Sequence, residues 1–473
     1  MKENLEVFRK NAYEFIDWIV EYLRDVEKYP VKSQVKPKEI YNKLPSRPPD
    51  TGEAIEVIFE DFKKIILPGI THWQNPNFHA YFPANSSNPS MLAEMLMSAL
   101  GVQNMKWETS PAATELEERV MNWLKEMTGL PESFSGVIQD TASTSTLAAI
   151  ITAREKYSDF KINSDGFKDF ENLRVYCSTE AHSSIEKAVK IAGLGKNNLV
   201  KIKVDEKFAM IPSELENAVN RDIENGFKPV CVIAALGTTG STAVDPLEEI
   251  TAICSKYKLW LHVDAAYAGS ALILPEYRWM IKGIEQADSF VFNPHKWLFT
   301  NFDCSAYFVK DKGNLIRTFE ILPEYLKTLS DNKVNNYCDW GIPLGRRFRA
   351  LKLWFVIRNF GVKGLQEKLR CHISIANNIA DKIKCDKEFE ILAPVTFNVI
   401  CFRYKPDGKT EEELNMLNEK ILHSVNSTGK MYFTHTKLNG KYTLRLVIGQ
   451  TNVTQNHLEK SWKLINETAK SLK

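Results

Sequence analysis

Apolar residues recur at three- and four-residue spacing in two stretches near the start of the chain. The first comprises Leu5, Phe8, Ala12, Phe15, Ile19, Leu23 and Val26, and the second comprises Ile55, Ile58, Phe59, Phe62, Ile65 and Ile66. This spacing predicts two amphipathic helices, and the five prolines between residues 30 and 49 predict an extended connector between them. Because so short an arm cannot bury both apolar stripes on itself, we expect it to pack against a second copy of the chain.

The pattern changes in the middle of the chain, where short β-branched runs alternate with amphipathic segments. Helices are predicted at about 89–101 and 111–127. The runs that follow are VYCS (175–178), LVKIKV (199–204), VCVIAAL (230–236), LWLHVD (259–264), SFVF (289–292) and AYFV (306–309). Continuous apolar strands separated by helical lengths predict a mostly parallel sheet covered by helices, an α/β fold. Ligands of such sheets bind at the carboxyl ends of the strands.

The pattern changes again toward the C-terminus. Beyond Arg346, long helical segments lead to two stretches that predict antiparallel strands, FEILAPVTFNVICFRY and MYFTHTKLNGKYTLRLVIG, with Asn439-Gly440 as a hairpin turn. We therefore expect an N-terminal helical arm (1–85), a large α/β domain (86–374) and a small C-terminal α+β domain (375–473).

Composition narrows the class of protein. The 473 residues include 61 basic and 59 acidic side chains, a formal charge of +2, so no overall field would attract nucleic acid or a membrane surface. The eight cysteines are scattered without zinc or redox-motif spacing, which favours a reducing cytosol. The first residues lack the apolar core of a signal peptide, and no apolar run approaches membrane-spanning length. These features predict a cytoplasmic globular protein.

Lys296 lies at the end of a predicted buried strand, the run SFVF. Pro294 cannot continue a ladder, so the chain must leave the sheet before His295, Lys296 and Trp297. Partial desolvation of a lysine makes its amine a better nucleophile toward carbonyl groups. The alternative is a lysine whose amine simply reaches out to solvent.

Two more polar residues follow predicted strands. Asp264 ends an apolar run, where a carboxylate must be paired, and a pyridinium nitrogen is one partner that fits. His182, after the strand VYCS, could stack on a planar ring or cap the next helix.

Hydroxyl groups mark two further strand ends. The segment GVIQDTASTSTLAAII turns from strand to helix through Thr141, Ala142 and Ser143, and a helix N-terminus can bind phosphate. Ordinary N-capping would use the same residues. Thr239, in LGTTG, offers a second hydroxyl beside a glycine turn.

Other ligand chemistries fit less well. A metal site would have to draw on His72, His79, His182 and His295, which lack metal-ligand spacing. The chain also contains neither a P-loop nor a dinucleotide-binding glycine motif.

Several motifs resemble one family. They are F-H-A-Y-F-P (78–83), A-H-S-S (181–184), H-V-D-A-A-Y-A-G (262–269), N-P-H-K-W (293–297) and P-L-G-R-R-F-R (343–349). In this order they are similar to the pyridoxal-phosphate-dependent aromatic L-amino-acid decarboxylases, the group II decarboxylases of fold type I. The similarity covers nearly the whole chain. A non-catalytic scaffold of this fold would be expected to have lost Lys296 or Asp264, and both are present.

The resemblance assigns roles around pyridoxal 5′-phosphate. It implies that Lys296 forms the internal aldimine, that Asp264 keeps the pyridine nitrogen protonated, and that His182 stacks on the ring. The other implied cofactor residues are Ala142, Ser143, Thr239, Asn293 and His295 near the phosphate and Ala266 under the ring. Loss of CO2 leaves a carbanion that only a conjugated, protonated ring can accept.

The resemblance also implies a reaction. Tyr325, in LPEYLKT, matches a loop tyrosine that protonates the quinonoid, whereas aldehyde-forming relatives tend to have phenylalanine there. We therefore expect a homodimer with shared active sites that converts an aromatic L-amino acid (Trp, Phe, Tyr or DOPA) to the arylalkylamine and CO2. An aromatic aldehyde synthase, or a decarboxylase for histidine or an acidic amino acid, is the alternative.

The substrate pocket is predicted by the same similarity. Trp73, Tyr81, Phe82 and Pro83 match the aromatic wall of the family, and Gly345 matches the glycine of plant members that accept indolic substrates. This chain departs from the family in four places: Ala84 replaces a threonine, Gln103 and Met105 replace apolar and aromatic residues, and Asp140 replaces a glycine before the phosphate loop. We expect the Asp140 carboxylate to point away from the phosphate, because like charges repel.

Overall fold

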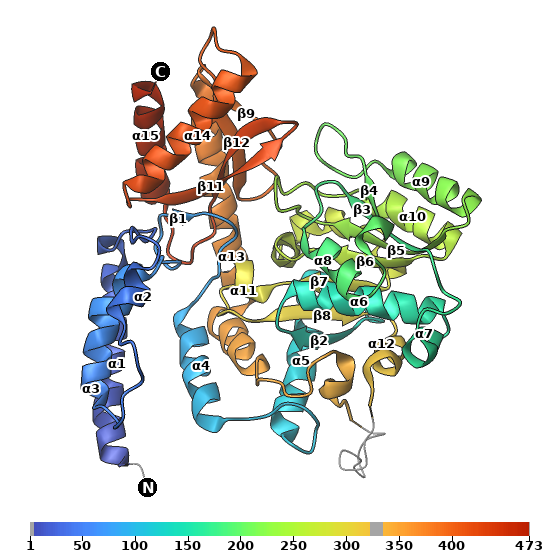
Figure 1. Ribbon diagram of the computed structural model, residues 1–473, viewed down its shortest axis with the longest axis horizontal. Helices are drawn as coiled ribbons and strands as arrows, with labels where there is room; N and C mark the ends of the chain where they lie inside the picture. The colour runs from blue at the N-terminus through green and yellow to red at the C-terminus, as the bar shows by residue number, and fades with distance from the viewer. Residues whose placement is uncertain (1–3, 322–333, 473) are drawn as a thin grey trace. The chain divides into compact units, whose positions relative to one another are not determined.

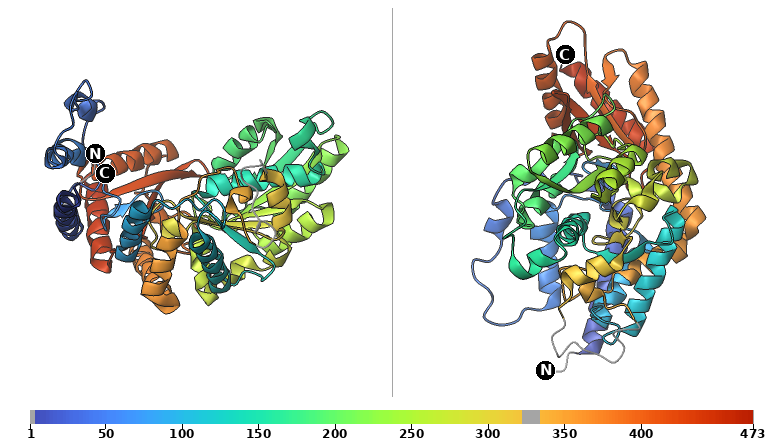
Figure 2. Two further views of the ribbon diagram at one scale, coloured as in Figure 1. Left: turned by 90° about the horizontal axis from the view of Figure 1, so that it is seen from below. Right: turned by 90° about the vertical axis from the view of Figure 1, so that its right-hand side faces the viewer.

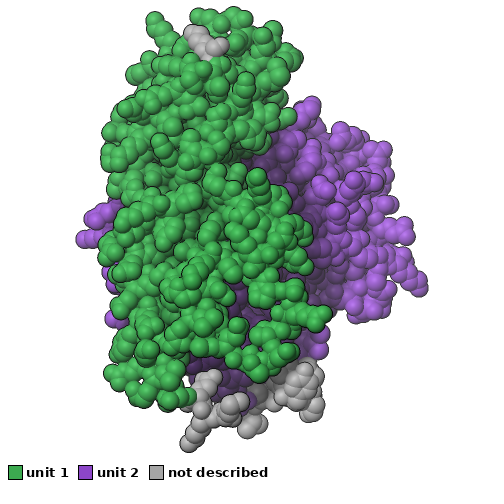
Figure 3. Space-filling model, turned by 60° about the vertical axis from the view of Figure 1, so that its left-hand side comes forward, with its two compact units in different colours: residues 1–83, 375–392, 400–473 green, residues 84–374, 393–399 purple. Residues whose placement is uncertain are grey.

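The computed structural model describes residues 4–321 and 334–472, which divide into two compact units (Figure 3). The central unit holds residues 84–374 and 393–399, and the terminal unit holds residues 1–83, 375–392 and 400–473. The two ends of the chain therefore belong to one unit. The predicted three-part division stays a prediction, although its first and third parts fall together here.

A sheet of seven strands forms the centre of the described part of the central unit, in the order β2-β8-β7-β6-β5-β3-β4. The strands are β2 (Ser135–Gln139), β3 (Leu173–Ser178), β4 (Leu199–Ile202), β5 (Lys228–Ala235), β6 (Trp260–Asp264), β7 (Ser289–Phe292) and β8 (Ser305–Val309). Among these described strands only β8 runs antiparallel to its neighbours. The mostly parallel sheet predicted from the apolar runs is confirmed.

Helices cover both faces of this sheet, as Figures 1 and 2 show, which explains why its strands are apolar throughout. The described α-helices of the central unit are α4 (Asn88–Leu100), α5 (Pro111–Thr128), α6 (Ala142–Tyr157), α7 (Lys161–Asp165), α8 (Ser184–Ile191), α9 (Pro212–Glu224), α10 (Leu247–Tyr257), α11 (Pro294–Trp297), α12 (Lys312–Phe319) and the first part of α13 (Ala350–Cys385), and not all of them contact the sheet. The helices predicted near 89–101 and 111–127 are confirmed. The hydroxyl of Ser110 caps α5 by accepting the N–H of Ala113 at 3.3 Å.

The terminal unit contains a second sheet, in which five described strands follow the order β1-β11-β12-β10-β9. They are β1 (Phe78–His79), β9 (Phe389–Ile391), β10 (Val399–Tyr404), β11 (Tyr432–Leu438) and β12 (Lys441–Val447). Asn439 and Gly440 turn the β11–β12 hairpin with φ of 49° and 78°, the conformation this dipeptide favours. Strand β1 pairs with β11 in parallel, and the sequence patterns did not predict this strand at Phe78–His79. Two residues are too few to show a pattern, and their partner is more than 350 positions away.

The helices of the terminal unit are α1 (Leu5–Asp25), α2 (Glu39–Lys43), α3 (Ile55–Asp61), α14 (Glu411–Ser427), α15 (Gln455–Ser471) and the end of α13. Both predicted N-terminal helices are confirmed, but α2 interrupts the connector that we expected to be extended. The stripes of α1 and α3 meet at Phe15 and Phe59, whose ring centroids are 4.3 Å apart. None of the helices in residues 4–321 and 334–472 is long and apolar enough to cross a membrane.

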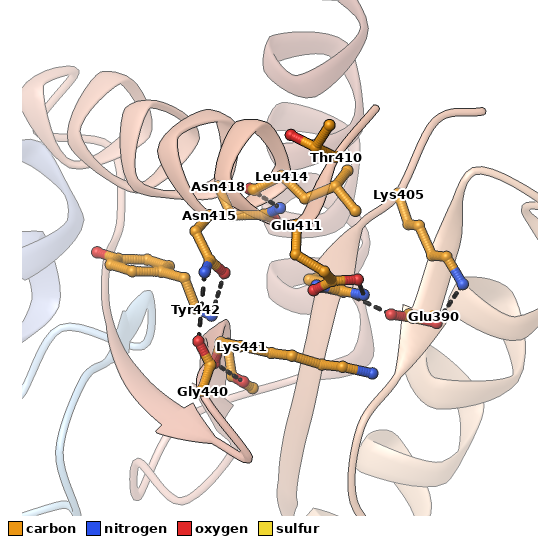
Figure 4. A network of polar contacts seen from close by, with 12 residues as sticks. Glu390, Lys405, Thr410, Glu411, Leu414, Asn415, Asn418, Gly440, Lys441 and Tyr442 are labelled. Atoms are coloured by element: carbon orange, nitrogen blue, oxygen red, sulfur yellow. Dashed lines mark hydrogen bonds and ion pairs between the residues drawn. The ribbon is translucent and has the colours of Figure 1, made fainter. Parts of the chain in front are cut away.

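Helix α14 fastens the hairpin of the terminal sheet (Figure 4). The amide of Asn415 donates to the carbonyl of Gly440 at 3.2 Å and accepts the N–H of Tyr442 at 2.6 Å. Asn418, one turn along the helix, exchanges hydrogen bonds with both backbone groups of Tyr404 at 2.8 Å. These side-chain bonds fix β10, β12 and the turn to one helix.

Candidate active site

The carboxyl ends of five strands in the central unit lie along one edge of the sheet. Ala235 of β5 is opposite Asp264 of β6, and Asp264 is opposite Val291 of β7. Every predicted cofactor residue follows one of these strands: Ala142 and Ser143 after β2, His182 after β3, Thr239 after β5, Asp264 and Ala266 at the end of β6, and Asn293, His295 and Lys296 after β7. Parallel strands therefore bring residues from between positions 142 and 296 to one edge.

The turn that holds Lys296 is fixed on both sides. The N–H of Asn293 donates to the carbonyl of Ala266 at 3.0 Å, which ties the turn after β7 to the turn after β6. The N–H of Lys296 donates to the carbonyl of Asn293 at 2.9 Å. Next along the chain, the buried indole of Trp297 donates to Nδ1 of His372 at 3.0 Å. The backbone beneath the half-buried lysine is thus held in one conformation.

Asp264 ends β6 with its carboxylate already oriented. Its Oδ1 accepts the N–H of Ala266 at 3.0 Å, and its carbonyl accepts the N–H of Leu236 at 2.9 Å. The side chain is half-buried at the end of a strand whose other residues are buried. A negative charge placed this way is available to a cationic group at the sheet edge.

His182 lies in the field of both charged residues. Desolvation by burial lowers the pKa of His182, the positive charge of Lys296 lowers it further, and the negative charge of Asp264 opposes the shift. The ring also caps the next helix, which was the alternative role predicted for it. Its Nδ1 accepts the N–H of Ser184 at 3.2 Å at the start of α8. A neutral ring that accepts at Nδ1 carries its proton on Nε2.

Sequence reasoning missed His262, which lies two residues before Asp264 on the same face of β6. Its Nδ1 is 2.9 Å from the hydroxyl of Ser289, and its Nε2 is 3.2 Å from the hydroxyl of Thr146 on α6. Burial lowers the pKa of His262 to about 4, so the ring is neutral at pH 7. The sequence did contain a signal for His262, because residues at i and i+2 of a strand share a face and Asp264 was already a candidate.

Helix α6 presents its N-terminus at the same edge. The N–H groups of Ala142 and Ser143 are in its first turn, where no intrahelical acceptor exists. The hydroxyl of Thr141 caps the helix by accepting from the N–H of Thr144 at 3.4 Å. Asp140 uses Oδ1 to accept the N–H of Thr141 at 2.7 Å, so this carboxylate is bound to its own loop.

The buried carboxylate of Asp245 fixes the loop that carries Thr239. Asp245 accepts the N–H groups of Ala235 and Met210, both at 2.7 Å, and burial raises the pKa of Asp245 to about 6. Gly237 has a φ of 90°, and a Cβ there would collide with the Cβ of Ala268, which would lie only 2.6 Å away. Thr239 itself is exposed at the tip of the loop.

His295 and Asn293 have side chains that bind protein groups. Nδ1 of His295 accepts the N–H of Cys304 at 2.9 Å, and Oδ1 of Asn293 accepts the hydroxyl of Ser305 at 2.7 Å. Burial, with the adjacent charge of Lys296, lowers the pKa of His295 to about 3. Both side chains therefore shape the lysine turn, and their contact with a phosphate stays a prediction.

The predicted substrate residues divide between the two units. Trp73, Tyr81, Phe82 and Pro83 belong to the terminal unit, whereas Ala84, Gln103, Met105 and Gly345 belong to the central unit. Within the central unit Gly345 and Gln103 are neighbours, because a Cβ at Gly345 would lie 3.3 Å from Oε1 of Gln103. Tyr325 lies outside the described residues.

The groups at the sheet edge fit a phosphorylated pyridine aldehyde. An amine for the aldehyde, a carboxylate for the ring nitrogen and a helix N-terminus for the phosphate follow neighbouring strands. A metal centre finds no such support in the described ranges, where no three His, Cys, Asp or Glu side chains are grouped as ligands. Fold and site together define an enzyme of the pyridoxal-phosphate class.

Comparisons with known proteins identify the family. The family model described as the pyridoxal-dependent decarboxylase conserved domain matches residues 37–405, and the chain belongs to this family. Tyrosine decarboxylase 4 of Petroselinum crispum is 44% identical over 99% of this chain and 94% of its own length. Phenylacetaldehyde synthase of Arabidopsis thaliana is 43% identical over 99% of this chain and 96% of its own length. The crystal structure of Oryza sativa TDC with PLP and tryptamine superposes with a TM-score of 0.97 at 34% identity, covering 100% of this chain and 99% of the other.

These findings confirm the family predicted from the motifs. The protein is a carboxy-lyase, and its cofactor is pyridoxal 5′-phosphate.

Proposed function

We propose that this enzyme decarboxylates an aromatic L-amino acid (Trp, Phe, Tyr or DOPA) and releases the arylalkylamine and CO2. The observation that carries the proposal is the placement of Lys296, Asp264 and His182 on one sheet edge, with mutual electrostatic effects. The similarity to a tyrosine decarboxylase over nearly the full length supports the aromatic substrate class.

Each residue at the edge has a proposed task. Bound pyridoxal phosphate supplies a conjugated ring that accepts the electrons left at Cα when CO2 departs. Lys296 holds the cofactor through its amine and, when released, serves as a base. Asp264, oriented by the N–H of Ala266, keeps a proton on the ring nitrogen. His182 would stack on the ring, with its proton on Nε2 because Nδ1 accepts from the N–H of Ser184.

The remaining contacts of the cofactor are proposed from position. The first-turn N–H groups of α6 and the hydroxyl of Thr239 are suited to bind the phosphate, because a helix N-terminus attracts anions. The proposed set is Ala142, Ser143, Thr239, Asn293 and His295 for the phosphate and its surroundings, with Ala266 under the ring.

Tyr325 is proposed to deliver the proton to Cα, which commits the reaction to the amine. Replacing it with phenylalanine removes that proton, so Tyr325→Phe should divert product from amine toward aldehyde, ammonia and hydrogen peroxide as O2 is consumed. Amine, aldehyde and peroxide are quantified in parallel, with Lys327→Ala as a control in the same segment. If Tyr325→Phe still yields only amine, the assignment is wrong.

An aromatic aldehyde synthase is the second candidate, because one such enzyme is 43% identical to this chain. The tyrosine at 325 favours the amine product, since the resemblance associates phenylalanine with aldehyde formation.

The pocket is proposed to accept an indole-sized side chain. Trp73, Tyr81, Phe82 and Pro83 form the aromatic wall in this proposal. Gly345 lacks the side chain that would press on Gln103, and the Gln103 amide oxygen can accept a hydrogen bond from an indole N–H or a phenol O–H. Ala84 and Met105 complete the proposed set.

We propose a homodimer in the cytoplasm. In the terminal unit, α1 and α3 leave large apolar side chains exposed, including Leu5 at 73% and Phe8 at 67%. In the central unit, α4 separately exposes Leu92 and Leu100. Unpartnered apolar faces of this kind are typical of subunit interfaces. All eight cysteines are free and six are buried, which suits a reducing compartment.

The test of the proposed function is product analysis. The purified, cofactor-loaded enzyme is incubated separately with Trp, Tyr, DOPA, Phe and His, and amine, aldehyde and peroxide are measured. Amine from an aromatic substrate without peroxide supports the proposal. Peroxide with aldehyde would establish the second candidate, and amine from His alone would overturn the aromatic assignment.

A further inference from the structure

The predicted aromatic wall is built onto the C-terminal hairpin of the same unit. Phe78 and His79 form the edge strand β1, in register with Tyr432 and Phe433 of β11. His79 is buried, and its Nδ1 lies 3.1 Å from the carbonyl of Val447 at the end of β12. The wall residues that follow β1 therefore start from a fixed point on the hairpin.

Tyr81 has a backbone conformation that needs support. Its φ is 52°, in the left-handed region that a tyrosine rarely adopts. The hairpin holds it at both peptide groups. The N–H of Tyr81 donates to the hydroxyl of Thr434 at 3.3 Å, and the carbonyl of Tyr81 accepts from Nη1 of Arg445.

Arg445 also contacts the next wall residue. It is 3% exposed on β12, and its guanidinium lies over the ring of Phe82 at 4.6 Å from the centroid. Thr434 and Arg445 are directly opposite each other in the β11–β12 register, so they act from one face of the hairpin. Tyr432, two residues before Thr434 on that face, places its hydroxyl 2.9 Å from the hydroxyl of Tyr81.

We propose that Arg445 and Thr434 are positioning residues that set the direction of Tyr81 and Phe82 and thereby the shape of the substrate wall. The inference rests on the proposed function for the wall's contact with substrate, and on the hairpin contacts alone for the clamp itself. Arg445 suits the task because its planar guanidinium can donate to a carbonyl and stack on a ring at the same time. A lysine can do neither as well.

Arg403 provides a matched control. It lies on β10, the strand next to β12, and is 1% exposed, so its loss also removes a buried arginine from this sheet. Its partners are Glu390 and Glu411, which are not part of the wall. Arg403→Gln thus reports the general cost of such a change, and Arg445→Gln adds the loss of the clamp.

The test compares wild type, Arg445→Gln, Arg445→Lys, Thr434→Val and Arg403→Gln as cofactor-loaded enzymes. Arg445→Gln should raise KM for aromatic amino acids by about tenfold or more, because a displaced wall no longer orients the substrate. Cofactor binding, followed by its absorbance, should stay at the wild-type level. Arg445→Lys should recover part of the loss, and Arg403→Gln should leave KM within about twofold of wild type.

Amide hydrogen exchange supplies a readout that does not depend on turnover. The peptide covering residues 80–85 should exchange faster in Arg445→Gln and Thr434→Val but not in Arg403→Gln, because only the first two release the peptide groups of Tyr81. Unchanged exchange in Arg445→Gln, or an equal rise of KM in both arginine variants, would overturn the proposal. If wild type acts on no aromatic amino acid, the proposed function fails, and exchange alone then decides whether the clamp exists.

Discussion

The cofactor edge of the central unit and the aromatic wall of the terminal unit are organised differently. At the cofactor edge, each important side chain follows its own strand by a few residues, as Lys296 follows β7 and Asp264 ends β6. In the wall, Tyr81 is held by Thr434 and Arg445, which are more than 350 positions away.

The difference teaches which parts of a site local sequence can specify. A strand end with its turn is a local structure. Parallel pairing then brings several such ends to one edge, and no specific contact between distant side chains is needed. The wall has no regular local structure beyond the two residues of β1, so its conformation depends on distant groups that satisfy its backbone. We therefore expect changes at the edge to affect the chemistry and changes on the hairpin to affect substrate orientation.

The largest expected effect is at the edge. Lys296→Ala removes the amine that we propose holds the cofactor, and turnover should fall by roughly a thousandfold or more while the fold is kept. CO2 release and the visible absorbance of the lysine-linked cofactor are the measurements. Lys310→Ala, at an exposed lysine just after β8, is the control and should behave as wild type. Near-normal activity of Lys296→Ala would contradict the chemistry proposed for this lysine. It would also show that the sheet edge is not the site of the reaction.

The next prediction concerns a long-range contact inside the central unit. It tests whether the central unit, like the wall, also depends on residues that are distant in sequence. Arg346, 4% exposed, donates to the fully buried Glu117 at 2.5 Å and to the carbonyl of Asn104 at 3.0 Å. Glu117→Gln leaves the guanidinium without its counter-charge and should lower the free energy of unfolding by about 3–5 kcal/mol. Denaturant unfolding measures the loss.

Arg347 is the control for that experiment. Its side chain is 51% exposed and pairs with Glu94 at 2.6 Å, so Arg347→Gln should cost less than about 1 kcal/mol. Equal losses in the two variants would show that burial of the Arg346–Glu117 pair does not matter, and that the loop bearing Gly345 is fixed by local structure after all.

The smallest predicted effect compares one buried histidine from each region, His79 and His262. Burial lowers the pKa of both to about 4, whereas an unfolded histidine has a pKa of about 6.5. Between these values only the unfolded chain takes up the proton. Each histidine therefore contributes its full stability above about pH 6.5 and loses about 1.4 kcal/mol per pH unit as the pH falls toward 4.

Unfolding midpoints at pH 5 and pH 7 test this. His79→Gln and His262→Gln should each reduce the difference between the two pH values. Only His262→Gln should also weaken cofactor binding, because His262 shares its strand face with Asp264. A pH difference that persists unchanged in both variants would show that other groups cause it.

Much of the fold could be predicted from the sequence because the patterns are local. The apolar runs predicted the strands, the three- and four-residue spacing predicted α1 and α3, and Asn439-Gly440 predicted the hairpin turn. Helices α4 and α5 were also predicted. His262 was missed although it shares a strand face with Asp264, and its contacts with Thr146 and Ser289 come from other elements. Strand β1 and helix α2 escaped because each is too short to show a period.

The sequence by itself determined the order of helices and strands along the chain, the lysine at one strand end and the carboxylate at another. It also determined the family to which the chain belongs. Those features depend on residues that are near one another in sequence, where hydrophobic period and turn chemistry act directly. Only the tertiary structure decided that the two chain ends share a unit, that Gln103 lies beside Gly345, and that Arg445 holds Tyr81 in a left-handed conformation. Such contacts join residues hundreds of positions apart, and no local pattern encodes which distant group will satisfy a given backbone carbonyl.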